Sequence, residues 1–178
     1  MFLFGHIGVT LGIFFGLAIL VPRLRILIDP TFVVIGALLP DLIDKPLGRI
    51  IFASTFANGR IIGHTLLFSL ILSMIGLYLY DKRMDVRVLS MATGSFFHLI
   101  EDEMWNTPDT LFWPIFGLRF PRGSSDNVGI WYLIRELENS FTFHLSRSYI
   151  PEILGMTIIV ILVLHSLLKR FSQNEKDN

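Results

Sequence analysis

Residues 61–80 read IIGHTLLFSLILSMIGLYLY, a run of twenty residues without a full charge. At 1.5 Å per residue, a helix of this length covers about 30 Å, which is the thickness of the hydrocarbon core of a bilayer. Tyr78 and Tyr80 close the run, where amphipathic rings meet lipid headgroups. The stretch therefore predicts a transmembrane helix, around which we expect the rest of the chain to be built.

Four further apolar segments accompany this helix. They are residues 1–22, 31–40, 86–105 and 149–168. The first lacks the basic start and the small-residue cleavage site of a secretory signal, so we interpret it as a membrane helix. The second is short, about 15 Å for ten residues, unless it continues past Pro40 to Asp44. The sequence thus predicts an all-α polytopic membrane protein with about five membrane-embedded helices, the second of them short.

The composition agrees with a membrane protein and argues against other classes. Of 178 residues, 52% are hydrophobic and 17% are charged, whereas a soluble domain has about a quarter charged residues. The 15 basic and 15 acidic residues cancel, which argues against a nucleic-acid partner that needs a basic face. The chain has no Cys, so a metal would have to be bound by His and carboxylates. We expect membrane lipids as partners, and the sequence leaves the oligomeric state open.

The predicted domain organisation is a single integral membrane domain, residues 1–170, followed by a polar, frayed tail, residues 171–178. Residues 106–148 are too polar to span and form an extramembrane loop, which could act as a lid. Within this loop, residues 127–140 have the pattern of a short amphipathic helix at the interface. The Lys and Arg residues on the side that holds the C-terminus lie in shorter connections than those on the other side, which predicts a cytoplasmic C-terminus in a multi-pass protein of the cell membrane.

Ionisable side chains inside apolar segments are expensive and need a partner or a function. Six of them stand out: His6, Asp41, Asp44, His64, His98 and Asp102. The histidines His6 and His64 lie near the starts of the first and third segments, and the other four residues lie near the ends of the second and fourth. Because the chain reverses direction at each span, all six emerge on the same side of the membrane. The sequence therefore predicts one cluster, on the outer side if the C-terminus is cytoplasmic.

Three imidazoles and three carboxylates suit one or two divalent metal ions. Zinc accepts both ligand types and keeps an open position for water in catalytic sites, and manganese or iron also accepts such a set. A bound metal makes water a nucleophile at neutral pH, and two metals stabilise both oxygens of a phosphoester displacement. In this hypothesis Asp44 is an additional ligand or a general base. Arg60, one turn before His64, holds an anionic group of the substrate.

Each of these residues also has a simpler interpretation. A single His near an interface is more often an amphipathic, hydrogen-bonded side chain than a metal ligand, and Arg60 is also typical of a base that flanks a membrane segment. Glu101 and Glu103 are interpreted as a solvated helix end. His144 in the loop is a remote candidate, and His165 lies on the opposite side. The metal hypothesis rests on the coincidence of six residues on one side.

Four motifs carry a resemblance to a known family. They are an apolar N-terminal segment with His6, GALLPDLID at 36–44, GRIIGHTLLFSL at 59–70 and GSFFHLIEDEMWNTPDTLFWPIFG at 94–117. In this order they resemble the membrane-bound metal-dependent hydrolases, also described as LexA-binding, inner-membrane-associated hydrolases, over about residues 1–117. The resemblance implies a multi-pass bacterial or archaeal membrane protein with a divalent-metal site. It assigns the metal to His6, Asp41, His64, His98 and Asp102.

The chain departs from this family pattern at two points. Asp41 and Asp44 are farther apart than the usual acidic pair, and Asn58–Gly59–Arg60 supplies the arginine without the histidine that often precedes it. The order of His and Asp is also similar to that of zinc-dependent phospholipase C, a more distant likeness that favours phosphoesters.

Together these patterns predict a membrane-embedded, metal-dependent hydrolase that acts on a phosphoester of a lipid or prenyl-type substrate. One alternative is a metal-ion or proton transporter, although a pathway needs polar groups at several depths and these crowd one side. The other is a non-catalytic membrane protein with a structural metal site, which a saturated coordination sphere would indicate. The chain has no nucleophile elbow, P-loop or dinucleotide motif.

Overall fold

The computed structural model describes residues 3–124, 128–141 and 149–177, and all regular structure in these ranges is helical. The all-α prediction is therefore confirmed. The longer helices are α1 (Leu3–Leu20), α3 (Pro30–Pro46), α4 (Leu66–Arg83), α5 (Arg87–Glu101), α7 (Ile130–Phe141) and α8 (Ile150–Asp177). Shorter pieces connect them, namely α2 (Leu24–Leu27), a π-helical turn (Leu47–Ile51), a 3₁₀ turn (Met104–Asn106) and α6 (Pro108–Leu111).

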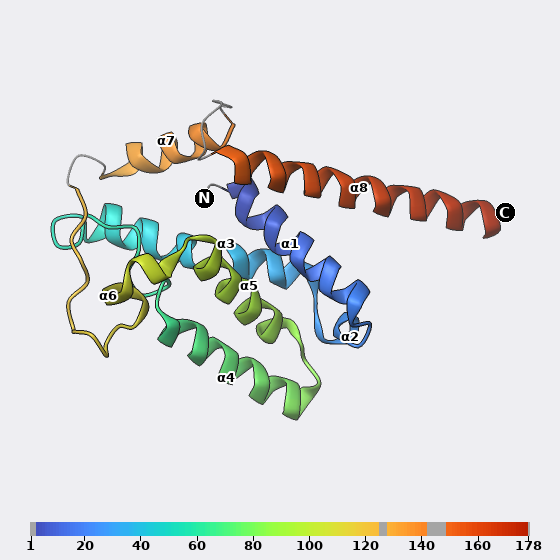
Figure 1. Cartoon of the computed structure of the whole chain (residues 1–178), viewed down its shortest axis with the longest axis horizontal. Coiled ribbons are helices and arrows are strands. Elements are labelled where there is room, and N and C mark those ends of the chain that lie inside the picture. The colour runs from blue at the N-terminus through green and yellow to red at the C-terminus, as the bar shows by residue number, and fades with distance from the viewer. Residues whose placement is uncertain (1–2, 125–127, 142–148, 178) are drawn as a thin grey trace.

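Helix α3 occupies the centre of the bundle. It packs against α5 and α1, while α4 packs against α5 and α8 packs against α1 (Figure 1). The C-terminal half of α8 projects beyond the other helices, and α7 lies near the opposite end of the bundle, beside the start of α8 (Figure 1). The C-terminal ends of α3 and α5 and the N-terminal ends of α1 and α8 lie on the same side of the bundle (Figure 1).

Two of the predicted segments differ from the helices that form. The prediction for residues 61–80 is wrong at its start, since α4 begins only at Leu66. The backbone N–H groups of Ile61, Gly63 and His64 donate to the Asp44 carboxylate instead of to helical carbonyls, so this stretch stays irregular. In the second, helix α8 continues through the predicted polar tail to Asp177.

The second segment forms a longer helix than its apolar run of ten residues. Asp29 begins α3, where its carboxylate accepts the N–H groups of Thr31 and Phe32. The helix then continues through Pro40 and ends at Pro46. This continuation places Asp41 and Asp44 on the last helical turns rather than in a loop.

Two helices of the described chain are long and apolar enough to cross a membrane, namely α1 and the part of α8 from Ile150 to Arg170. Helices α3 and α5 have 17 and 15 residues, and α4 ends in three charged residues, DKR. Helix length by itself therefore supports a membrane protein but does not establish the predicted five spans.

Glycines allow the central helices to approach closely. A Cβ atom on Gly94 of α5 would overlap the carbonyl oxygen of Val33, and one on Gly36 of α3 would overlap that of Met91. The backbones of α3 and α5 are thus in direct contact, as small residues permit in membrane bundles. This contact sets the distance between the ends of the two helices.

We expect Gly94→Val to lower the free energy of unfolding by about 1–3 kcal/mol, because the branched side chain forces α3 and α5 apart. The free energy of unfolding, followed by circular dichroism during denaturation in mixed micelles, measures this effect. Gly16→Val in α1 is the matched control, since a Cβ atom there meets nothing within 4 Å. Equal losses in the two variants would contradict the close α3–α5 contact.

Candidate metal centre

The structure brings the six predicted residues together at one end of the bundle. They come from the first turn of α1 (His6), the last turns of α3 (Asp41, Asp44), the segment before α4 (His64) and the end of α5 (His98, Asp102). The three histidines and Asp44 are fully buried, and the Asp102 side chain is only 5% exposed. Segments up to 96 residues apart in the chain thus share one polar site inside an apolar bundle.

Asp44 holds His64 in place. Its Oδ2 lies 2.8 Å from Nδ1 of His64. Its two oxygens also accept the backbone N–H groups of Ile61, Gly63 and His64 at 2.7, 2.8 and 3.1 Å. Because Nδ1 donates its hydrogen to Asp44, the lone pair of a neutral His64 ring lies on Nε2. Asp44 therefore orients the His64 ring through Nδ1 and leaves Nε2 facing the centre of the cluster.

His98 presents its Nε2 to the same point. Its Nδ1 lies 2.6 Å from the carbonyl oxygen of Ala37, which can only accept, so Nδ1 carries the hydrogen. The Nε2 atoms of His98 and His64 are 3.2 Å apart. When both rings are neutral, two lone pairs face each other at this distance and repel, and either a proton on one Nε2 or a metal ion between them removes the repulsion. Two nitrogens on one tetrahedral zinc ion, with bonds of about 2.0–2.1 Å, lie about 3.3 Å apart.

Two carboxylates face this pair of imidazoles. Oδ1 of Asp41 lies 3.7 Å from Nε2 of His64 and 3.9 Å from Nε2 of His98. Oδ2 of Asp102 lies 3.6 and 4.0 Å from the same two nitrogens. These spacings are longer than hydrogen bonds but match the separation of neighbouring ligands around one ion. Each carboxylate thus lies near both imidazole nitrogens, and two groups of three candidate ligands result, Asp41–His64–His98 and His6–His98–Asp102.

His6 lies beside this group. Its ring stacks on His98, with centroids 4.0 Å apart. Its Nε2 lies 3.4 Å from Oδ1 of Asp102, is buried, and has no hydrogen-bond partner among the described residues. The two oxygens of Asp102 therefore face different histidines, as a carboxylate does when it bridges two ions.

Glu101 supports His6 in the way that Asp44 supports His64. Its Oε2 lies 2.8 Å from Nδ1 of His6, and its Oε1 accepts the hydroxyl of Thr10 at 2.7 Å. The sequence interpretation of Glu101 as a solvated helix end missed this contact, since the side chain is only 5% exposed. The signal was available, because Glu101 follows His98 by three residues and so shares its helix face.

Glu152 fixes the position of the N-terminus of α1, the helix that carries His6, relative to α8. This buried acid in the first turn of α8 accepts the backbone N–H groups of Phe4 and Gly5, both at 3.0 Å. A carboxylate is favourable at a helix N-terminus, where these donors have no helical partner. Nothing in the sequence linked Glu152 to α1, from which it is about 147 residues away.

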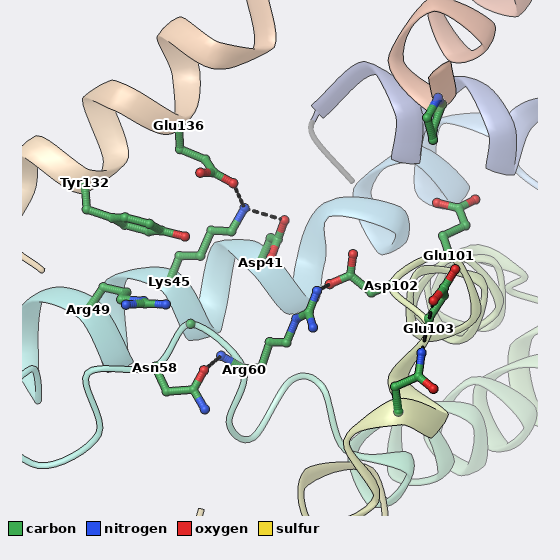
Figure 2. A pocket seen from close by; sticks show the side chains of 13 residues that line it. Asp41, Lys45, Arg49, Asn58, Arg60, Glu101, Asp102, Glu103, Tyr132 and Glu136 are labelled. Carbon is green, nitrogen blue, oxygen red and sulfur yellow. Dashed lines mark hydrogen bonds and ion pairs between the residues drawn. The ribbon is translucent and has the colours of Figure 1, made fainter. Parts of the chain in front are cut away.

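A pocket of about 710 Å³ opens beside the cluster. Asp41 and Asp102 line it, and so do three bases, Lys45, Arg49 and Arg60. Figure 2 shows Arg60 pointing to Asp102, with Nη2 and Oδ2 2.8 Å apart. The Arg60 side chain is 41% exposed, so this predicted anion-binding residue lies at the rim, next to the candidate ligands.

Helix α7 contributes the opposite wall of the pocket. Nζ of Lys45 lies between Oδ2 of Asp41, at 2.8 Å, and Oε1 of Glu136, at 3.0 Å (Figure 2). The guanidinium carbon of Arg49 lies 4.9 Å from the centre of the Tyr132 ring. Burial raises the pKa of Tyr132, so its side chain stays a neutral phenol at pH 7. Sequence analysis predicted the helix at 127–140 but not these contacts with the pocket.

The charges around the pocket favour a cation. Its lining has five acids, Asp41, Glu101, Asp102, Glu103 and Glu136, against the three bases Lys45, Arg49 and Arg60. The excess of two negative charges equals the charge of one divalent ion. The donor set, the facing Nε2 atoms and the Nε2 of His6, which lacks a hydrogen bond to any described residue, all fit such an ion. Oxygen and imidazole ligands suit zinc, manganese or iron.

Of the histidines that the structure describes, His165 does not join the cluster. Its side chain is exposed in the C-terminal half of α8, the part of this helix that projects beyond the bundle (Figure 1). His144, the remote candidate of the loop, falls outside the described residues.

A helical bundle with membrane-length apolar helices and a buried His–carboxylate cluster defines the class, an integral membrane protein with a candidate metal centre. The chain belongs to the YdjM inner membrane protein family, whose model matches residues 1–172. This confirms the predicted membrane localisation and is consistent with the resemblance to membrane-associated hydrolases. Comparison with curated proteins and with solved structures gives no match, and the likeness to zinc-dependent phospholipase C has no support.

Proposed function

We propose that this protein is a membrane-embedded, metal-dependent hydrolase that acts on a phosphoester of a lipid or prenyl-type substrate. The observation that carries the proposal is the 3.2 Å approach of the Nε2 atoms of His64 and His98. Both rings are held by bonds at Nδ1, so neither can turn its lone pair away without losing a buried hydrogen bond. This is an arrangement suited to holding a metal.

In the proposed site, four residues would hold the first ion: Asp41, His64, His98 and Asp102. His6 and the second oxygen of Asp102 would contribute to a second ion. Bound metal supplies an activated water and positive charge opposite the charge that develops on the phosphoryl oxygens. Asp44, with both oxygens occupied by N–H donors, serves to position His64 rather than to bind metal or accept a proton.

The pocket supports an enzyme over a structural metal site. Asp41 and Asp102 line both the cluster and the open volume of about 710 Å³, so a ligand in the pocket would reach the ions directly. Arg60 at the rim would exchange its bond with Asp102 for a substrate oxygen and so orient the anionic group. A structural site has its coordination sphere closed by protein and needs no such volume.

We also propose that α3, α4 and α5 lie in the membrane with α1 and α8, which gives the five embedded helices, and that the distribution of Lys and Arg places the C-terminus in the cytoplasm. The polarity of α4 supports this, because it buries Ser69 and Gly76 while Leu70, Met74 and Leu77 are exposed. A helix with its apolar side chains outward and its small residues inward is typical of lipid surroundings.

Metal-dependent release of phosphate tests the proposed function. The purified protein in lipid nanodiscs is supplied with a long-chain prenyl monophosphate or phosphatidic acid, and inorganic phosphate is measured. We expect hydrolysis that EDTA abolishes and that zinc or manganese restores, and loss of hydrolysis in Asp102→Asn. Metal-loaded protein with no hydrolysis of either lipid would contradict the proposal, and metal flux into vesicles would favour a transporter instead.

A further inference from the structure

Apolar side chains of α7 face outward, together with the exposed charged side chains of Arg135 and Glu138. By helical spacing Glu138 lies on the same side as Ile134, one turn further along the helix. Four of its apolar side chains point outward, with exposed fractions of 56% for Ile130, 72% for Trp131, 37% for Ile134 and 55% for Leu137. These residues recur at helical spacing and form one face, which we call the outer face. Its polar side chains Tyr132 and Glu136 instead line the pocket.

Three contacts fix this orientation of α7. Glu136 is paired with Lys45 at 3.0 Å, and Tyr132 lies against the Arg49 guanidinium. Just before the helix, the N–H of Gly129 donates to the carbonyl oxygen of Arg49 at 2.7 Å. Rotation of α7 to hide its apolar residues would break these contacts and would place Glu136 outside. The outward apolar face is therefore imposed by the pocket.

The surroundings of α7 indicate what covers this face. The protein belongs to a membrane family, and α7 lies at the same end of the bundle as the start of α8 (Figure 1). There Ile150 and Leu154 are also apolar and exposed, at 62% and 51%, on a helix long enough to cross the membrane. Trp is enriched where acyl chains meet headgroups, and Arg135 beside Trp131 is exposed to reach such headgroups.

We propose that the outer face of α7 inserts into the bilayer at the boundary between headgroups and acyl chains. Helix α7 is then the wall that separates the pocket from lipid, with one side in the membrane and the other on Lys45 and Arg49. The pocket thereby lies at headgroup height. An amphiphile with an anionic headgroup reaches it from the side of the bilayer, past α7, while its chains stay in lipid. The membrane contact itself does not depend on hydrolase activity.

Spin-label accessibility tests this contact, and the absence of native Cys makes single labels possible. Nitroxides are attached to Ile134→Cys and Leu137→Cys in full-length protein reconstituted in phosphatidylglycerol–phosphatidylethanolamine vesicles. We expect relaxation by oxygen, which concentrates in lipid, to exceed relaxation by a water-soluble nickel chelate several-fold. Asp81→Cys, on the 71% exposed side chain at the end of α4, is the aqueous control and should show the reverse.

Two results would overturn the proposal. One is nickel accessibility at positions 134 and 137 equal to that at position 81, which would mean that the outer face lies in water. The other is strong dipolar broadening between labels without preferential relaxation by oxygen, which would mean that a second copy of the chain covers it. If labelling disturbs folding, Trp131 fluorescence in a Trp105→Phe, Trp113→Phe variant replaces it, and brominated lipids should quench this fluorescence more than aqueous acrylamide does.

Discussion

Replacing His98 with alanine is expected to remove nearly all tightly bound divalent metal from the purified protein. Loss of a residue that only orients a metal ligand typically costs about 10–100-fold in metal affinity, and loss of a ligand that faces the centre should cost more. His98 has a large effect because its Nε2 lies within 4.0 Å of His64, Asp41 and Asp102. The protein is passed through gel filtration in a mild chelator, and its metal content is then measured by inductively coupled plasma mass spectrometry.

The control for this experiment is His165→Ala, which removes an exposed imidazole far from the cluster. It should leave the metal content unchanged. Because His98 also bonds to Ala37 and stacks on His6, folding of the variant is checked separately by its helical circular dichroism. Equal metal content in folded His98→Ala and in the wild type would eliminate the proposed centre.

Asp44→Ala is expected to lower the free energy of unfolding by about 3–5 kcal/mol, the cost of removing one partner from a buried ionic or hydrogen-bonded group. The substitution leaves three backbone N–H groups and Nδ1 of His64 without their acceptor. These donors lie in buried, irregular backbone between the π-helical turn and α4, where water does not replace the lost acceptor. Denaturation in mixed micelles, with helical signal as readout, measures the change.

Asp81→Ala removes an exposed aspartate of the same bundle and should leave stability within about 0.5 kcal/mol of the wild type. Asp44→Asn adds a second comparison. If Asp44 positions His64, the folded Asn variant should bind metal about 10–100-fold more weakly but still bind it. Full loss of metal with unchanged stability would instead make Asp44 a direct ligand.

The sequence was informative about the site because the order of the segments fixes the direction in which each one runs. His6, Asp41, His64 and His98 lie at alternating starts and ends of successive segments, so a chain that reverses at each segment must gather them at one end. The all-helical class followed from composition and from long uncharged runs such as residues 61–80. None of this required knowledge of which helix touches which.

The tertiary structure decided which atoms of these residues meet. The donors for Asp44 come from Ile61, Gly63 and His64, and the pairing of those N–H groups with a carboxylate instead of a helix moved the start of α4 to Leu66. The Asp44 carboxylate and the helical carbonyls compete for the same N–H groups, and the outcome depends on the contact between α3 and the segment before α4. Hydropathy does not record this contact, so it favoured the longer helix.

By itself, then, the sequence determined the helical class, the membrane environment and the common end on which six polar residues lie. Only the folded chain determined that Glu101 supports His6, that Glu152 caps α1 and that Lys45 links Asp41 to α7. The physical reason is that periodicity and segment order are recorded along one chain. Hydrogen bonds and ion pairs depend on ångström-scale distances between side chains that lie about 90 to 150 residues apart.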